Sequence, residues 1–244
     1  MQYGDFSFNG ILASDMGVIV TSQVQYIRPQ ETVSTVQVPG RSGVVTLRGS
    51  SYYEQTSYTP TCAMKPTANR EKVFAWLRGR GNVIFGSMPD YQFDARLSNQ
   101  IAFTELLAGD GNGYLSFAPV FLCQPYRYQA VPDADIKITT TASGSYDLEN
   151  PGNVASAPVI TVVGTGTITI TCGGNAMVLS LPKDGVIIDS EMQDCYDLDK
   201  AVLMTSLADG EFPMIPAGNS TLQWTLAEGA TISSITVRPG WRWI

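Results

Sequence analysis

In the stretch Trp76-Leu-Arg-Gly-Arg-Gly-Asn-Val-Ile-Phe-Gly-Ser-Met-Pro-Asp-Tyr-Gln-Phe-Asp-Ala-Arg96, a predicted helix end is followed by two predicted strands and their connection. Residues 83–85 are uniformly apolar, which is typical of a buried strand. Residues 87–90 contain Pro and Asp in a turn pattern. Residues 91–97 alternate apolar and polar side chains, which predicts a strand with one wet face. The stretch predicts a structural unit and carries no catalytic arrangement.

A short helix is predicted just upstream, over residues 68–78. Thr67 is placed to cap its first turn, which also holds Glu71. Arg78 falls in the expected last turn, where a cation interacts favourably with the helix dipole, and Gly79 and Gly81 follow as the stop. One face of this helix is apolar: Val73, Phe74, Trp76 and Leu77.

Length and charge limit the classes of protein to which this chain can belong. The chain has 244 residues, of which 44% are hydrophobic, so it is long enough for one large β domain or two ordinary ones. Residues 1–129 carry ten Lys/Arg against nine Asp/Glu, a net +1, whereas residues 130–244 carry five against thirteen, a net −8. A chain this acidic, without a basic cluster, is a poor candidate for gripping nucleic acid. The sequence shows neither a signal peptide nor an apolar span, so we expect a protein made in a cytosol, without membrane insertion.

The absence of histidine removes several kinds of chemistry. Ser-His-Asp and Cys-His nucleophiles, His-ligated zinc and the usual proton shuttle near neutral pH all require it. The four cysteines are widely separated and form no C-x-x-C pair: Cys62, Cys123, Cys172 and Cys195. We expect reduced, buried thiols in preference to a disulfide or a reactive residue, and no catalytic, metal or cofactor site.

The first domain, residues 1–129, is predicted to be mostly β. Residues 33–38 and 44–47 flank the glycine-rich connection 39–43, which is typical of a hairpin. Arg41 lies in that connection, where it is either a solvated loop side chain or a contact to a neighbouring subunit. Residues 100–107 fit a strand or a helix equally well.

The second domain, residues 130–244, is predicted to be an antiparallel β-sandwich. Its apolar, β-branched runs are separated by glycine-rich turns every ~8–12 residues, which is the spacing that two facing sheets require. Gly164-Thr-Gly166 is interpreted as one of these turns, between strands at 158–163 and 167–172. No helix of useful length is predicted in this half.

Two clusters in the second domain allow a functional interpretation beside a structural one. Five carboxylates fall in one segment: Asp189, Glu191, Asp194, Asp197 and Asp199. Their spacing fits neither a calcium loop nor a glycosidase pair, so a solvated acidic loop is preferred. The chain end, residues 238–244, contains Trp241 and Trp243, which either pack on the protein itself or recognise a surface.

Taken together, several motifs resemble the distal tail protein (Dit) of long, flexible-tailed bacteriophages, and the resemblance covers nearly the whole chain. The matching motifs, in order, are Phe6-Ser-Phe-Asn-Gly10 with Ser14-Asp-Met-Gly17, Val38-Pro-Gly-Arg-Ser-Gly43, Trp76-Leu through Pro89-Asp90 to Ala95-Arg96, Asn150-Pro-Gly152 with Ala157-Pro158, Ile168-Thr-Ile170, Ile188-Asp-Ser-Glu191, and Gly210-Glu-Phe-Pro213 before Pro216-Ala-Gly-Asn219. Each motif is weak alone, and their order and spacing are jointly specific.

The resemblance implies a mainly β protein of two domains. The N-terminal β-barrel or sandwich, tail-tube-like with its one short helix, would form a homohexameric ring, and the C-terminal galectin-like sandwich would project outward. Such a ring joins the tail tube protein to the baseplate hub or tail fibre at the tip of the virion, with a receptor-binding protein as a further partner. It passes DNA through its lumen, is made in the host bacterial cytoplasm and is not an enzyme.

Within that interpretation, three basic residues of the first domain are candidates for subunit contacts: Arg41, Arg78 and Arg80. Trp241 and Trp243 are the candidates for surface recognition, and the last residues, 238–244, are alternatively expected to pack back on the N-terminal domain. A galectin's carbohydrate site uses a histidine, so sugar binding is not carried over to this chain. The alternative function is a carbohydrate-binding adhesin that recognises the host cell surface; an acid-dependent glycosidase rests only on the carboxylate cluster.

Overall fold

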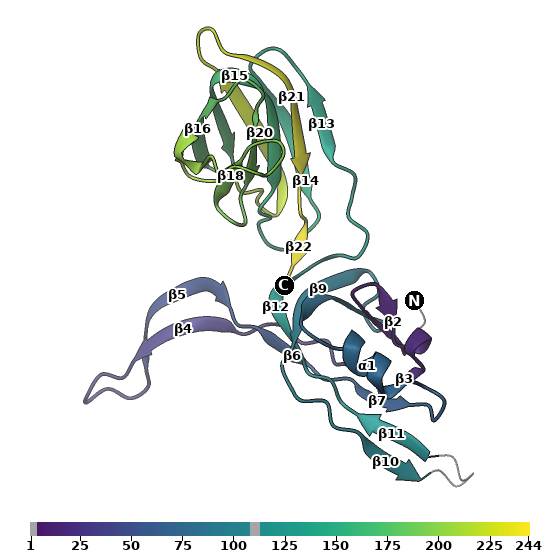
Figure 1. Ribbon diagram of the computed structural model, residues 1–244. Helices are drawn as coiled ribbons and strands as arrows, with labels where there is room; N and C mark the ends of the chain where they lie inside the picture. The colour runs from purple at the N-terminus through teal and green to yellow at the C-terminus, as the bar shows by residue number, and fades with distance from the viewer. Residues whose placement is uncertain (1–3, 108–112) are drawn as a thin grey trace. The chain divides into compact units, whose positions relative to one another are not determined.

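The computed structural model describes residues 4–107 and 113–244, with the backbone alone at 48–51 and 106–107. The chain divides into two compact units: unit 1 is Met1–Val131 with Ile244, and unit 2 is Pro132–Trp243 (Figure 1). One α-helix and two 3-10 turns accompany the strands of the described residues. The predicted mainly β fold with one short helix is therefore confirmed.

Unit 1 contains two antiparallel sheets and a separate two-stranded ribbon. The larger sheet has the order β2-β1-β8-β9-β12, with β6 also paired to β12, and the smaller has the order β10-β11-β7-β3. The strands are β1 (Phe6–Phe8), β2 (Ile11–Leu12), β3 (Val18–Ser22), β4 (Glu31–Val36), β5 (Val45–Tyr53), β6 (Thr56–Tyr58), β7 (Thr61–Met64), β8 (Arg80–Phe85), β9 (Tyr91–Leu97), β10 (Thr104–Leu107), β11 (Gly113–Phe117) and β12 (Phe121–Gln129). A 3-10 turn, Ser14–Met16, separates β2 from β3.

Three sequence expectations for unit 1 can be compared with these strands. β8 and β9 form the antiparallel pair predicted from the opening stretch, with Val83 opposite Phe93. β4 and β5 form the predicted hairpin around residues 39–43. The ambiguous segment 100–107 ends in a strand, because Thr104–Leu107 pairs with β11.

The helix α1, Arg70–Trp76, is shorter than the predicted 68–78. Its cap is Asn69, whose Oδ1 accepts a hydrogen bond from the Lys72 N–H at 3.2 Å, so the expectation of Thr67 as the cap is wrong. No basic residue lies in the last turn, which corrects the placement of Arg78 there. Asn and Thr are both good caps, and sequence alone does not choose between two that lie two residues apart.

An aromatic core fastens this helix to the larger sheet of unit 1. The Trp76 ring stacks on Phe6 with centroids 5.5 Å apart, and Trp76 Nε1 donates to the Phe8 carbonyl oxygen at 2.9 Å. Phe121 meets Phe6 edge-on at 5.4 Å. Phe74 is the exception on the predicted apolar face, since it is 40% exposed. Trp76 therefore contributes both apolar area and a hydrogen bond to the attachment of this helix.

Unit 2 is a sandwich of two antiparallel sheets that share one long strand, β15. One sheet has the order β13-β21-β15-β17-β18, and the other has the order β14-β20-β15-β16-β19 (Figure 1). The strands are β13 (Ile136–Thr139), β14 (Gly144–Asn150), β15 (Val159–Cys172), β16 (Asn175–Leu181), β17 (Val186–Asp189), β18 (Asp194–Tyr196), β19 (Ala208–Gly210), β20 (Gly218–Leu226), β21 (Thr231–Arg238) and, at the chain end, β22 (Arg242–Trp243).

The predicted turn at 164–166 is wrong, because β15 runs through both glycines. Val159–Val162 pairs with β17 and the strand from Gly166 pairs with β16, so the glycines mark where the strand passes from one sheet to the other. A β-carbon on Gly164 would lie 2.3 Å from the Thr231 carbonyl oxygen, and one on Gly166 would lie 2.7 Å from the Ala230 Cα. The strand bends at these two positions and the backbone of a neighbouring segment lies close to them, so only glycine fits. A bend and a close approach of another backbone are common reasons for glycine within a strand.

Candidate subunit-contact surface

The β4–β5 ribbon is an exposed arm of unit 1. All of β4 is exposed, and β4 and β5 pair with each other and with no other strand of the described residues (Figure 1). The arm and the segment that leads into it expose many large apolar side chains: Tyr26, Ile27, Val33, Val36, Val38, Val44, Leu47 and Tyr52. An isolated two-stranded ribbon has little stability of its own, and contiguous exposed apolar surface usually marks an interaction site.

The base of the arm is attached to the larger sheet by polar and aromatic contacts. The Arg127 guanidinium on β12 lies over the rings of Tyr26 and Tyr91, with its central carbon 4.7 and 4.8 Å from their centroids. Tyr58 donates its hydroxyl to the Ile27 carbonyl oxygen at 3.2 Å. Burial raises the pKa of Tyr58 to about 12, so this donor keeps its proton. The arm therefore leaves the sheet at a fixed point.

Arg41 lies in the loop at the end of the arm. The loop turns through two glycines with positive φ, Gly40 at 82° and Gly43 at 83°. The Arg41 N–H donates to the Val38 carbonyl oxygen at 3.1 Å, and its side chain is exposed. No carboxylate of the described residues lies within ion-pair distance of that side chain. Its guanidinium is available to a carboxylate or a carbonyl of another molecule.

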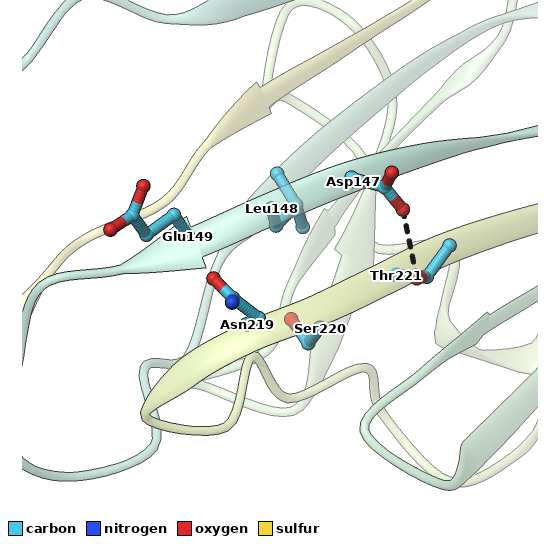
Figure 2. A pocket seen from close by; sticks show the side chains of 6 residues that line it. All are labelled: Asp147, Leu148, Glu149, Asn219, Ser220 and Thr221. Carbon is cyan, nitrogen blue, oxygen red and sulfur yellow. Dashed lines mark hydrogen bonds between the residues drawn. The ribbon is translucent and has the colours of Figure 1, made fainter.

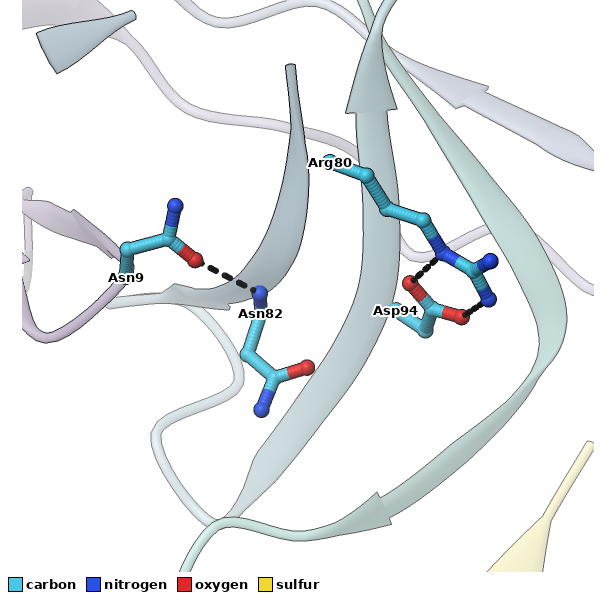
Figure 3. Close-up of polar contacts among 4 residues, drawn as sticks. All are labelled: Asn9, Arg80, Asn82 and Asp94. Carbon is cyan, nitrogen blue, oxygen red and sulfur yellow. Dashed lines mark hydrogen bonds and ion pairs between the residues drawn. The ribbon is translucent and has the colours of Figure 1, made fainter. Parts of the chain in front are cut away.

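Arg80, at the start of β8, is already paired within its own unit. Its Nε donates to Asp94 Oδ1 at 2.9 Å, and its terminal nitrogen contacts Asp94 Oδ2, a two-pronged ion pair across β8 and β9 (Figure 3). The Arg80 side chain is 70% exposed. Arg78 is exposed as well and lies between α1 and β8. The sequence did not reveal Asp94 as the partner, because β8 and β9 place it opposite Asn82, two residues from Arg80 in the pairing register.

A tight contact beside Arg80 joins the first hairpin to β8. Asn9, in the turn between β1 and β2, accepts a hydrogen bond through Oδ1 from the Asn82 N–H at 3.2 Å (Figure 3). The Asn9 N–H in turn donates to the Asn82 carbonyl oxygen at 2.9 Å. A β-carbon added to Gly81 would lie 1.6 Å from that Asn9 Oδ1. A side chain at 81 would therefore displace Asn9 from its hydrogen bond to the Asn82 N–H, whereas the sequence suggested only that Gly81 helps to stop the preceding helix.

Trp241 and Trp243, near the end of the chain, both pack within unit 2. Trp241 is 7% exposed and belongs to the core of the sandwich, and its Nε1 donates to Asp133 Oδ2 at 3.1 Å. Trp243 is half-buried and packs against the same core. Both side chains therefore pack on the protein itself, which is one of the two interpretations that the sequence allowed.

Three carboxylates of the acidic segment accept hydrogen bonds from groups within unit 2. Asp189 Oδ1 accepts from two backbone N–H groups, those of Glu191 and Met192, at 3.1 Å each. Asp197 Oδ1 accepts from two more, at 2.7 and 2.9 Å, and Asp194 Oδ1 accepts from a threonine hydroxyl at 3.1 Å. Over the described residues, no group of three or more Cys, Asp or Glu is placed to hold a metal ion.

The four cysteines are free and buried. Burial raises the pKa of Cys62 and Cys123 to about 12, and that of Cys172 and Cys195 to about 11. Their thiolate forms are scarce at neutral pH, which makes them poor nucleophiles. Within residues 4–107 and 113–244, no helix is long and apolar enough to cross a membrane.

A polar hollow of about 560 Å³ lies along β14 and β20. Asp147 and Glu149 come from β14 and stand opposite Thr221 and Asn219 of β20 (Figure 2). Thr221 donates its hydroxyl to Asp147 Oδ1 at 3.0 Å. The hollow has no aromatic side chain among its lining residues, which all lie in the described part of the chain.

The whole chain is similar in fold to a solved protein structure. The chain is similar to a crystal structure described as the SPP1 Dit (gp 19.1) protein, a paradigm of the hub adsorption apparatus in phages that infect Gram-positive bacteria, with a TM-score of 0.67 and 15% identity. The similarity covers 96% of this chain and 97% of that one. The chain has a Dit-like fold. The resemblance found in the sequence motifs is thereby confirmed at the level of fold. No family model matches the chain, and no curated protein matches its sequence.

Proposed function

We propose that this protein is a structural component of a phage tail that forms a homohexameric ring between the tail tube and the baseplate hub or tail fibre. DNA would pass through the ring during infection, and a receptor-binding protein would be a further neighbour. The observation that carries the proposal is a Dit-like fold over nearly the full length of both chains. Fold alone does not fix function, so the surface features of this chain must supply the rest of the argument.

The exposed arm supports assembly through unit 1. Its apolar side chains have no core of their own, and a neighbouring copy is the partner most directly available to cover them. In a closed ring each copy can offer its arm to the next and receive one from the other side, which is a head-to-tail contact. Arg41 would then reach a carboxylate or carbonyl of that neighbour or of an adjoining ring.

The charge division of the chain supports the same arrangement. Residues 1–129 carry a net charge of +1 and residues 130–244 carry −8. Copies packed around an axis repel one another less through the nearly neutral part than through the acidic part. We expect unit 1 to form the ring and unit 2 to lie outside it.

Mass in solution and electron microscopy test this proposal. The full chain should have six times the mass of one copy and should appear as a ring with a central hole. A truncated chain that ends at Val131, where the continuous segment of unit 1 ends, should still assemble. A truncated protein that is folded yet strictly monomeric, beside a hexameric full chain, would show that unit 2 makes the ring contacts.

Substitutions on the arm separate its role from general surface effects. Leu47 is 62% exposed, so Leu47→Ser should leave the subunit folded while lowering the assembled fraction at a given concentration. Arg41→Ala should act in the same direction and Arg41→Lys should not restore it, because an ammonium cannot reproduce a forked contact. Val178→Ser is the matched control, since Val178 is an exposed strand residue of unit 2. Unchanged assembly in both arm variants would make the arm ordinary surface.

A further inference from the structure

A second hollow of unit 2, of about 420 Å³, lies where three segments meet. Asn175 comes from the start of β16, Ser190 and Gln193 come from the turn after β17, and Glu211 and Phe212 follow β19. None of these residues belongs to the arm or to the other subunit-contact candidates. The hollow therefore needs an explanation separate from ring formation.

Ser190 lines this hollow and has a buried hydroxyl without a partner. The residue is 4% exposed, and its Oγ has no hydrogen-bond partner among the described residues. Its backbone N–H is satisfied, since it donates to the Pro158 carbonyl oxygen at 3.1 Å. Buried hydroxyls are nearly always hydrogen-bonded, so an orphan one beside a hollow indicates a group that enters from solvent.

The turn that carries Gln193 into the wall is held in an unfavourable backbone conformation. Gln193 has φ of 57°, a left-handed value that few residues other than glycine adopt. Asp189 stabilises the turn, because its Oδ1 accepts hydrogen bonds from the N–H groups of Glu191 and Met192. Non-glycine residues in this region are concentrated at binding sites, where surrounding contacts impose the strain.

The opposite wall is fixed by backbone contacts. Gly210 has φ of 110°, and a β-carbon there would lie 2.3 Å from the Ala176 carbonyl oxygen, so β19 approaches β16 closely. The same oxygen accepts a hydrogen bond from the Glu211 N–H at 2.9 Å. Asn175 Nδ2 donates to the Phe212 carbonyl oxygen at 2.8 Å. Glu211 and Phe212 are thus presented from a rigid segment, which lowers the cost of binding a ligand.

From these groups we infer that the hollow is a carbohydrate-binding site for a neutral sugar unit. The Glu211 carboxylate can accept from sugar hydroxyls, and the Gln193 amide can both donate and accept. Phe212 and Met214 supply an apolar wall for the C–H face of the ring. No Lys or Arg lines the hollow, all of whose lining residues are described, which disfavours phosphate or nucleic acid.

The inferred site does not depend on ring formation, and each can fail alone. It also differs from the sugar-binding alternative suggested by the sequence, because that alternative relied on Trp241 and Trp243, which pack on unit 2 itself. The hollow along β14 and β20 is also lined by a buried hydroxyl without a partner among the described residues, that of Ser220, but only the present hollow of these two has an aromatic side chain in its lining.

Saturation-transfer NMR on the full chain tests the inference with glucose, galactose and N-acetylglucosamine, each added alone. At least one sugar should receive signal, strongest on the protons of one ring face. Glu211→Gln and Gln193→Gly should each weaken that binding, by about tenfold for the loss of a hydrogen bond to a charged group at Glu211. Glu228→Gln, an exposed site of unit 2 outside the hollow, is the matched control and should bind as the parent does.

The result is decisive in either direction. Gln193→Gly suits the backbone φ of 57°, so it stays folded even if the Glu211 variant does not. Absence of signal from all three sugars overturns the inference, and so does a signal that both variants leave unchanged. Binding of lysine or arginine amide, with no sugar signal, would make the hollow a site for a cationic side chain instead.

Discussion

The Arg127 guanidinium lies over the ring of Tyr26, with 4.7 Å from its central carbon to the ring centroid, and this contact fastens the arm to the sheet. Arg127 is 7% exposed, and its Nε has no hydrogen-bond partner within the described residues. A guanidinium removed from water in this way depends on the faces of its aromatic neighbours. The contact therefore links the stability of unit 1 to the position of the exposed arm.

Tyr26→Ala should destabilise unit 1 by about 0.5–2 kcal/mol, the range of a cation–π contact from exposed to desolvated sites. Tyr26→Phe keeps the ring and should cost much less. Urea unfolding at a fixed protein concentration measures the difference as a shift in midpoint. Tyr52→Ala is the control, because Tyr52 is 76% exposed and has no ring contact among the described residues. An equal loss in the Tyr26 and Tyr52 variants would contradict the assigned role.

Gly81→Ala should destabilise unit 1 by about 0.5–1.5 kcal/mol, because the added methyl group displaces the Asn9 side chain and breaks its hydrogen bond to the Asn82 N–H. Asn9→Gly should rescue it. Asn9 has φ of 52°, which glycine adopts freely, and removing its side chain clears the space. The double variant should be more stable than Gly81→Ala alone, and thermal unfolding of all four proteins gives the coupling. Simple additivity of the two losses would show that the clash is relieved elsewhere.

The class of fold could be predicted from the sequence because it depends on periodicity. Alternation over residues 91–97 and the spacing of glycine-rich turns indicate strands whatever their partners are. What a glycine does depends on its neighbours in space. Gly164 looks like part of a turn in the sequence, yet it lies inside β15. Glycine is needed there because the Thr231 carbonyl oxygen of another strand lies close to it.

The same reason limits what could be said of the candidate sites. Arg127 has no carboxylate near it in the sequence, and its contacts come from Tyr26 and Tyr91, which are distant along the chain. In the sequence Ser190 looks like an ordinary turn residue, and only the folded structure shows that it lines a hollow where three segments meet. Arg41 was found because glycines flank it within a hairpin, which is a local signal.

Alkaline pH should destabilise the protein through its buried thiols and one phenol. Burial raises the pKa of Cys62 and Cys123 from 9 to about 12, and that of Tyr58 from 10 to about 12. The unfolded chain therefore loses these protons first, so the free energy of unfolding is unaffected below pH 9 and falls between pH 9 and 12. Denaturant unfolding at several pH values measures this decline.

The same burial predicts slow thiol labelling. At pH 8 a thiol-reactive disulfide reagent should modify all four cysteines only after unfolding, because reaction needs an exposed thiolate. Cys62→Ala with Cys123→Ala should flatten the alkaline decline in part, whatever its effect at neutral pH. Rapid labelling of the native protein would show that the cores open far more readily than their burial indicates.

The last prediction concerns the hole in the proposed ring. A lumen lined with unpaired Lys and Arg would bind phosphates, release counterions and slow the passage of DNA, so its lining should be neutral or acidic. The ten basic residues of the first 129 would then lie mainly at subunit contacts and outer faces. Arg80 fits this, since Asp94 already offsets its charge, and exposed Arg78 is the neighbouring contact candidate. Fluorescence anisotropy with a labelled duplex should detect no binding at either low or physiological salt. Tight binding that falls steeply with salt would contradict a channel built for passage, as would a hexamer whose pore is ringed by unpaired arginines.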